Sequence, residues 1–93
     1  MIFETIDELK EANERINHFW FSDSAMGFFK TRIESQIHNN FFITSELAPE
    51  ASNRRYTIRK ADSKGRVNTA GEFQEFSTFE AAEIEMNRLL GGK

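Results

Sequence analysis

The first part of the chain alternates apolar and polar residues with the period of an α-helix. The apolar stripe comprises Ile6, Leu9, Ala12, Ile16, Phe19 and Trp20. Thr5, just before this stripe, and Glu8, three residues later, have the spacing of a capping box. In a capping box each of the two side chains accepts a hydrogen bond from a backbone N–H of the first helical turn. The pattern predicts a helix over residues 5–19. A second stripe, made of Met26, Phe29, Ile33 and Ile37, predicts another helix over residues 24–37.

The middle of the chain has the composition and alternation of β-strands. Residues 41–46 are rich in aromatic and β-branched side chains and predict one strand. Residues 55–60 predict another, in which Tyr56 and Ile58 share the core-facing side. The other side of this strand is expected to lie open and to carry Arg55, Thr57 and Arg59.

A turn at residues 61–65 follows, with Gly65 where a left-handed backbone is favoured. It leads to a return strand over residues 67–74, in which Phe73 is expected to face the core. Closing this hairpin predicts the cross-strand pairs Ile58–Thr69, Tyr56–Gly71 and Arg55–Glu72.

The last stretch again has helical periodicity. Ser77 and Glu80 form a second capping box, and Gly91 ends a helix predicted over residues 77–90. Its apolar stripe comprises Phe79, Ala82, Met86, Leu89 and Leu90. Ile84 points away from that stripe and is expected to be exposed, and Phe28 likewise lies off its own stripe.

Together these elements predict an α+β fold in the order ααβββα. We expect a three-stranded antiparallel sheet with the helices packed on one face. The length suits one modest core, so residues 1–93 are expected to form a single domain. The chain has no cysteine, no long apolar run and an acidic N-terminal segment. These features indicate a cytoplasmic protein with neither disulfides nor membrane association.

Catalysis is not expected from these residues. Neither His18 nor His38 has a nucleophile and an orienting acid nearby in sequence, and no phosphate-binding glycine motif occurs. Glu11, Glu14 and His18 share one helix face and could contact a metal ion. A solvated ridge with local contacts is the favoured interpretation, so neither a metal nor a cofactor is predicted.

Charge is unevenly distributed along this chain of net charge −3. Bases crowd residues 54–66, where Asp62 is the sole acid, and such a basic hairpin could bind nucleic acid. Acidic ridges on the first and last helices could instead meet a basic partner. The candidate partner-binding residues are Asp7, Glu11, Glu14, Arg55, Thr57, Arg59 and Ile84. A homodimer formed through a strand edge or through Ile84 is a further alternative to a monomer.

Four segments carry a family resemblance. They are FFKTRIE from Phe28, FITSE from Phe42, RYTIR from Arg55 and GEFQEF from Gly71. In this order they resemble small phage- and prophage-encoded proteins of uncharacterised function that share the core FFxSRI, FxTSE, RxYTVR and GxFQxY. Thr31, Ile58 and Phe76 depart mildly from that core. Arg32 and Glu46 are polar positions within it, and we expect them to pair.

The resemblance implies a phage setting but supplies no catalytic residues. Small phage proteins without enzymatic motifs act by stoichiometric binding to a host protein, and anti-CRISPR proteins are a class of this size and acidity. The expected function is therefore anti-defence, by binding a CRISPR–Cas protein. The alternative is a nucleic-acid-binding accessory or regulatory module that uses the basic hairpin.

Overall fold

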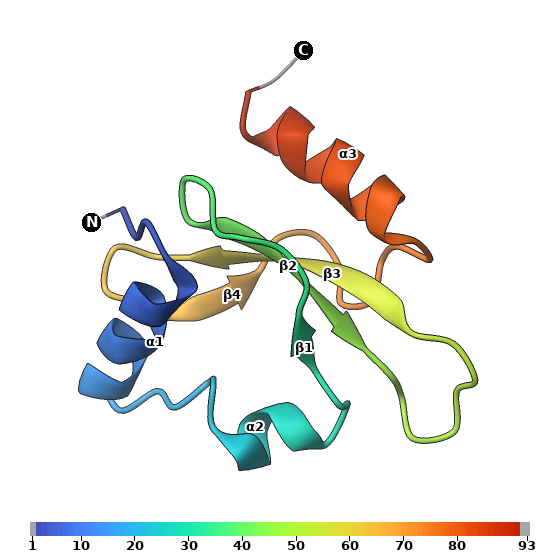
Figure 1. Ribbon diagram of the computed structural model, residues 1–93, viewed down its shortest axis with the longest axis horizontal. Helices are drawn as coiled ribbons and strands as arrows, with labels where there is room; N and C mark the ends of the chain where they lie inside the picture. The colour runs from blue at the N-terminus through green and yellow to red at the C-terminus, as the bar shows by residue number, and fades with distance from the viewer. Residues whose placement is uncertain (1, 92–93) are drawn as a thin grey trace.

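Seven elements follow one another in the computed structural model, which describes residues 2–91. In chain order they are α1 (Ile6–Arg15), α2 (Asp23–Gly27), β1 (Arg32–Ile33), β2 (Phe41–Glu46), β3 (Arg55–Ala61), β4 (Val67–Thr69) and α3 (Phe79–Leu89). The strands form one antiparallel sheet in the order β1-β2-β3-β4 (Figure 1). The α+β class is confirmed. The prediction of three strands was wrong, because β1 adds a fourth and changes the order to ααββββα.

The helices pack on both faces of the sheet, not on one as predicted. Successive residues of β2 point to opposite faces, so Phe42 and Ile43 enter different apolar clusters. Ile43 packs with Ile58 of β3 and with Ala82 of α3. Phe42 packs in a second cluster that contains residues of α1, and Figure 1 shows α1 and α3 well separated. Because β2 is buried along its whole length, both faces of the sheet are covered.

The predicted helix over residues 24–37 was wrong after its first turns. The helix α2 ends at Gly27, and Lys30 takes a left-handed backbone with φ of 50°. The chain then enters β1, where Arg32 pairs with Ser45 and Ile33 with Thr44. A stripe of apolar residues is ambiguous over so short a segment. Backbone pairing of residues 32–33 with β2 therefore decides the structure, although the spacing of the apolar residues also fits a helix.

The register of the hairpin formed by β3 and β4 differs by one residue from the predicted register. Asp62 accepts the backbone N–H groups of Lys64, Gly65 and Arg66 at 2.9–3.0 Å, which leaves Ala61 opposite Val67. Thr69 therefore pairs with Arg59 and not with Ile58. The strand was also predicted too long, because β4 ends at Thr69.

Residues 70–76 form an irregular segment where a strand was expected. Gly71 has a φ of 90°, and Tyr56 pairs with Phe76 through two backbone hydrogen bonds of 2.7 and 3.0 Å. The predicted pairs Tyr56–Gly71 and Arg55–Glu72 are therefore wrong. Phe73, expected in the core, is 42% exposed.

The helix starts were predicted more closely than their ends. Thr5 caps α1 by accepting from the Glu8 N–H at 3.1 Å, as expected. The cap of α3 is Thr78, one residue after the predicted Ser77. The first helix stops at Arg15, short of the predicted residue 19.

The side chain of Asn13 joins α1 to the rest of the molecule, beside the apolar packing of Leu9 and Ala12. Asn13 is fully buried, and its Nδ2 donates to the Gly65 carbonyl at 2.8 Å while its Oδ1 accepts the Trp20 N–H at 2.6 Å. Gly65 has a φ of 103°, and a Cβ there would lie 2.8 Å from the Cβ of Ala12. The turn between β3 and β4 thus needs glycine both for its backbone and for the close approach of α1.

A first prediction follows from this close approach. Gly65→Ala should lower the free energy of unfolding by about 1–3 kcal/mol, through a strained backbone and a clash with Ala12. The matched control is Gly27→Ala, because a Cβ at Gly27 meets nothing within 4 Å. That control should raise stability by about 0.4–1 kcal/mol. Urea unfolding measures both, and equal effects of the two substitutions would contradict the packing described.

A second prediction concerns pH. The backbone N–H of Arg66, with those of Lys64 and Gly65, holds the pKa of Asp62 below its ordinary value. A carboxyl with a lowered folded-state pKa stabilises the fold above its unfolded pKa, and that contribution disappears as pH falls through the folded value. The stability difference between the wild type and Asp62→Asn should therefore be constant near neutral pH and shrink below about pH 4. Thermal melts across this range check it. A difference that grows on acidification would contradict the assignment.

Candidate functional site

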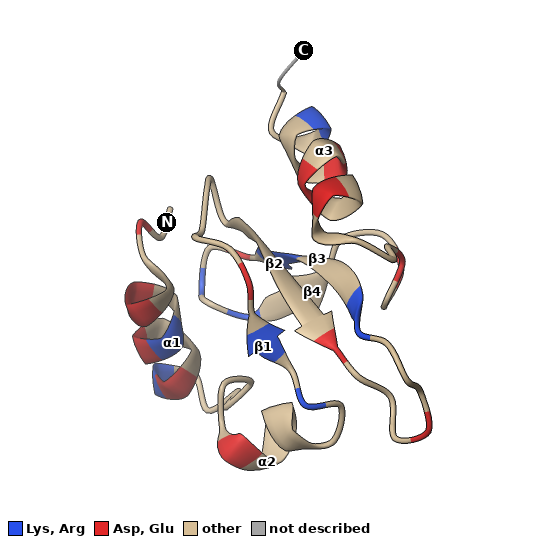
Figure 2. Ribbon diagram, turned by 45° about the vertical axis from the view of Figure 1, so that its right-hand side comes forward, with Lys and Arg blue, Asp and Glu red and all other residues tan. Residues whose placement is uncertain are grey.

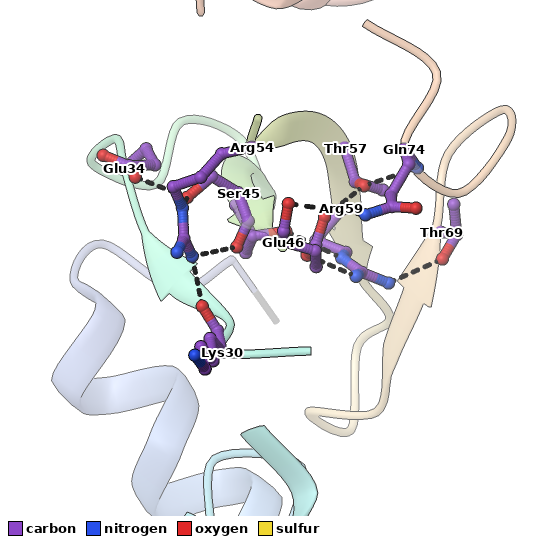
Figure 3. Close-up of polar contacts among 10 residues, drawn as sticks. Lys30, Glu34, Ser45, Glu46, Arg54, Thr57, Arg59, Thr69 and Gln74 are labelled. Atoms are coloured by element: carbon purple, nitrogen blue, oxygen red, sulfur yellow. Dashed lines mark hydrogen bonds and ion pairs between the residues drawn. The ribbon is translucent and has the colours of Figure 1, made fainter. Parts of the chain in front are cut away.

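A buried ion pair lies on the sheet face that was expected to be open. Glu46 is fully buried, and its Oε2 accepts from Arg59 Nη2 at 2.8 Å and from Thr44 Oγ1 at 2.6 Å. Its Oε1 accepts from Thr57 Oγ1 at 2.6 Å. Arg59 also donates to Thr44 at 3.1 Å and to Thr69 at 2.7 Å (Figure 3). We call Thr44, Glu46, Thr57 and Arg59 the buried ion-pair network.

Aromatic rings and one irregular segment cover this network. The guanidinium carbon of Arg59 lies 5.3 Å from the Trp20 ring centroid and 5.4 Å from that of Phe73. The Gln74 N–H donates to Thr57 Oγ1 at 2.8 Å. Among the described residues, no buried side-chain nitrogen or oxygen lacks a hydrogen-bond partner. The network is therefore fully hydrogen-bonded and almost entirely removed from solvent.

Two of the predicted partner-binding residues are corrected by this arrangement. Thr57 is fully buried and Arg59 is 7% exposed, so neither is presented to a partner. Alternation along β3 correctly placed them on one face, but residues from other segments cover that face. Arg55 remains exposed, with its guanidinium donating to the carbonyls of Gln74 at 2.7 Å and Glu75 at 3.0 Å.

A second polar cluster lies on the opposite face of the sheet, around Ser45. Arg54 Nε donates to Ser45 Oγ at 2.8 Å, and Ser45 Oγ donates to Glu34 at 2.5 Å. Arg54 also donates to the carbonyl of Lys30, which ties the segment before β1 to the start of β3 (Figure 3). The expected pairing of Arg32 with Glu46 was wrong, since Glu46 pairs with Arg59.

The predicted acidic residues lie on two separate helices. Asp7, Glu11 and Glu14 are all exposed on α1, but bases interrupt the ridge, and Arg15 pairs with Glu11 at 3.3 Å (Figure 2). This ridge is mixed in charge, because Lys10 and Arg15 are exposed on the same helix.

The outer face of α3 is more uniform. Glu80, Glu83 and Ile84 are exposed there, and Ile84 is 72% exposed, as expected from its position off the stripe. We call these three residues the acidic face of α3, and Figure 2 shows red acidic positions along this helix. A hydrogen bond from Arg88 lowers the pKa of Glu85, so that carboxylate is ionised and locally paired. An exposed apolar side chain close to two carboxylates is the kind of surface that a basic partner contacts.

An aromatic surface lies at another part of the molecule. Phe28 is 67% and Phe73 is 42% exposed, and Phe29 joins them with ring-centroid distances of 4.7 Å to Phe28 and 5.0 Å to Phe73. We call Phe28, Phe29 and Phe73 the aromatic surface. Phe28 could be singled out from the sequence because it lies off its stripe. Phe73 could not, because it sits in a segment whose alternation is that of a strand.

No cluster of side chains suited to holding a metal ion occurs in residues 2–91. No three His, Asp or Glu side chains gather there as a metal site would require. His18 Nδ1 lies 3.0 Å from Asn13 Nδ2, within the contact that seats α1. None of the helices in the same part of the chain has the length and apolar character of a membrane span.

Comparison with family models gives one informative result. Residues 5–87 match the model of a family of unknown function (DUF7447). The chain belongs to DUF7447. The match spans α1 to most of α3, so the family includes both helical layers and the whole sheet. No curated protein and no solved structure matches the chain. DUF7447 membership therefore defines a shared domain without assigning an activity to it.

A third prediction tests the buried ion-pair network. Glu46→Gln should lower the free energy of unfolding by about 3–5 kcal/mol, because it leaves the Arg59 charge buried without its counterion. The double variant Glu46→Gln/Arg59→Met should lose less than the sum of its single variants, with a coupling of about 0.5–3 kcal/mol. Urea unfolding of the four proteins measures this cycle.

The control is a shorter ion pair at the surface. Arg88 and Glu85 approach to 2.6 Å, yet both are solvated, so Glu85→Gln should leave the urea midpoint nearly unchanged. If the Glu46 and Glu85 substitutions had equal effects, burial would not be the cause of the loss.

Proposed function

We propose that this protein acts by stoichiometric binding to another protein through the acidic face of α3, and not by catalysis. The observation that supports this most directly is the 72% exposure of Ile84, which lies next to Glu83 and one turn after Glu80. Burial of an exposed isoleucine under a partner stabilises the complex. The nearby carboxylates orient such a contact and favour a basic partner. The partner surface that fits is an apolar spot within a basic groove.

The position of α3 favours such docking. The helix is anchored by Ala82 and Met86 on the sheet, so its outer face is rigid before any partner arrives. In both ribbon views α3 stands apart from α1 and α2 (Figures 1 and 2). A preorganised helix loses little conformational entropy on binding.

We propose further that the partner is a CRISPR–Cas protein of a bacterial host, bound in its cytoplasm. The resemblance of four segments to phage-encoded proteins supports the setting. CRISPR effectors hold nucleic acid in a positively charged channel. An acidic helix can occupy such a channel in place of phosphates, because carboxylates meet the same arginine and lysine side chains.

The alternative, nucleic-acid binding through the basic hairpin, receives less support from the geometry. Thr57 and Arg59 are inside the protein, and Arg59 is neutralised by Glu46. Arg55, Lys60, Lys64 and Arg66 are exposed, but Arg55 donates to the carbonyls of Gln74 and Glu75, and Lys60 lies over the Phe41 ring. Exposed bases of this kind are common on hairpins that bind nothing.

A fourth prediction tests the docking face. Ile84→Asp should weaken partner binding by about 2 kcal/mol or more, roughly thirty-fold, as expected for an interface hot spot. The free energy of unfolding should fall by less than about 1 kcal/mol, because Ile84 is mostly exposed and only helix propensity changes. The tagged protein is expressed in a CRISPR-bearing host, interference is scored by plasmid transformation, and bound proteins are identified by mass spectrometry.

Charge reversal distinguishes the two acidic helices. Glu80→Lys/Glu83→Lys on α3 should restore interference, whereas the matched Glu11→Lys/Glu14→Lys on α1 should leave inhibition intact. The opposite result would move the contact to α1. If the wild-type protein left CRISPR interference unchanged, the proposed CRISPR–Cas partner would be rejected. If the protein formed a concentration-dependent dimer that Ile84→Asp abolished, the acidic face of α3 would be a self-association surface.

A further inference from the structure

The segment that follows α1 holds a strained backbone. Asn17 has a φ of 61° and Phe19 a φ of 54°, both in the left-handed region. Asparagine tolerates this region, whereas phenylalanine rarely adopts it. Phe19 is 48% exposed, so tight packing of its ring does not compensate for the strain. A backbone of this kind persists only where other contacts hold it in place.

The contacts that hold this segment converge on one residue, Asn13. Its backbone carbonyl accepts the His18 N–H at 3.1 Å, and its Oδ1 accepts the Trp20 N–H at 2.6 Å. Its Nδ2 also lies 3.0 Å from Nδ1 of the His18 ring. Residues 17–20 are therefore fixed to α1 by a single buried side chain and its own backbone.

Backbone groups determine which way the Asn13 amide points. The Trp20 N–H can only donate, so the atom that faces it is Oδ1. The Gly65 carbonyl can only accept, so the atom that faces it, at 2.8 Å, is Nδ2. Turning the amide over would place N–H against N–H and oxygen against oxygen. One hydrogen of Nδ2 thus goes to Gly65, and the other points at His18.

This arrangement requires a neutral His18 ring. Nδ1 must accept the hydrogen from Asn13, which an imidazole does only when its proton is on Nε2. A protonated ring has N–H groups at both nitrogens, so its Nδ1–H would meet the N–H of Asn13. Because Asn13 is fully buried, the amide hydrogen that loses His18 has no water to replace it.

The charged groups around His18 act in both directions. They are Glu14 and Arg15 on α1, Asp62, Lys64 and Arg66 in the hairpin turn, and Arg59 beyond Trp20. The carbonyl end of α1 favours a cation, and the bases of the turn disfavour one. None of these groups forms an ion pair with His18 in residues 2–91. The contact with the Asn13 amide is the direct polar contact of the ring there.

We propose that His18 is a pH-sensitive switch, which holds residues 17–20 against Asn13 when neutral and releases them when protonated. The strain at Phe19 favours the release, and the release withdraws the Trp20 ring from the Arg59 guanidinium, 5.3 Å away. The held state excludes a proton. Its stability is therefore complete above the range in which imidazoles titrate, and it is lost as pH falls through that range. The switch does not depend on the acidic face of α3.

Hydrogen exchange of the Trp20 backbone N–H tests the release directly, because that N–H is bonded to Asn13. After correction for the intrinsic pH dependence of exchange, its rate should rise by about 5- to 100-fold between about pH 7.5 and pH 5.5, as for loss of a buried hydrogen bond. Trp20 is the one tryptophan of the chain, so its fluorescence should change over the same range. The effect of Asp62 lies below about pH 4 and is separate from this transition.

Nitrogen-15 NMR of the two histidine rings tests the geometry without any substitution. At about pH 8 the His18 ring should carry its proton on Nε2. His38 provides the internal reference, because it is exposed and its ring has no hydrogen bond to a residue in the described part of the chain.

Two matched variants assign the transition. His18→Gln keeps a side-chain acceptor but cannot titrate, so the pH dependence of Trp20 exchange should disappear. His38→Gln removes the other histidine of the chain and should leave that dependence unchanged. Circular dichroism checks the fold of each variant, and the NMR measurement on the wild type decides the geometry if His18→Gln fails to fold.

Three results would overturn the proposal. The first is a His18 ring that carries its proton on Nδ1 at about pH 8. The second is a corrected Trp20 exchange rate that does not change between the two pH values. The third is a transition that survives in His18→Gln or disappears in His38→Gln.

Discussion

The structure depends on keeping the Glu46 carboxylate and the Arg59 guanidinium together out of water. Each would be costly to bury alone, so the pairing is maintained by hydroxyl groups of Thr44 and Thr57 that satisfy the remaining hydrogen-bonding capacity. A slip of β2 against β3 would turn these side chains to the other face and separate the charges. The ion pair therefore specifies register in a way that the apolar residues around it do not.

The Glu46–Arg59 ion pair also supports parts of the protein surface. Through the Phe73 ring it supports the aromatic surface, and through Thr57 it receives the backbone of Gln74 and so positions residues 70–76. On the other side of the sheet the contacts are aliphatic, with Ile43, Ile58 and Met86 seating α3. One face of the sheet thus supports exposed aromatic rings, and the other supports α3 with its exposed isoleucine.

Features governed by neighbouring residues could be predicted from the sequence. The strand at residues 41–46, the Thr5 cap and the exposure of Ile84 all follow from local spacing. The region of Ile33 and Ile37 could not, because their spacing fits a helix and a strand-and-turn equally, and pairing with β2 decides. The hairpin register was one residue off, since the sequence does not show that Asp62 gathers three N–H groups.

The burial of polar side chains was the feature hardest to predict from the sequence. It also changed the set of candidate site residues more than any other feature. Alternation places Thr57 and Arg59 on one face of β3 but contains no information on what covers that face. Trp20 and Phe73 cover it from segments that are far away in sequence. Thr57 and Arg59, which were expected on an open binding face, are consequently interior, whereas Arg55 stays exposed.

The seating of α1 by Asn13 has a consequence for reading other DUF7447 sequences. Its amide both donates, to the carbonyl of Gly65, and accepts, from the N–H of Trp20. Aspartate has no donor and leucine has neither group, although both are close in size, so no isosteric exchange preserves the contact. An asparagine in the first helix together with a glycine in the hairpin turn thus forms a two-position signature of this docked arrangement. In a relative that lacks both the asparagine and the glycine, the first helix must pack against the sheet through other contacts.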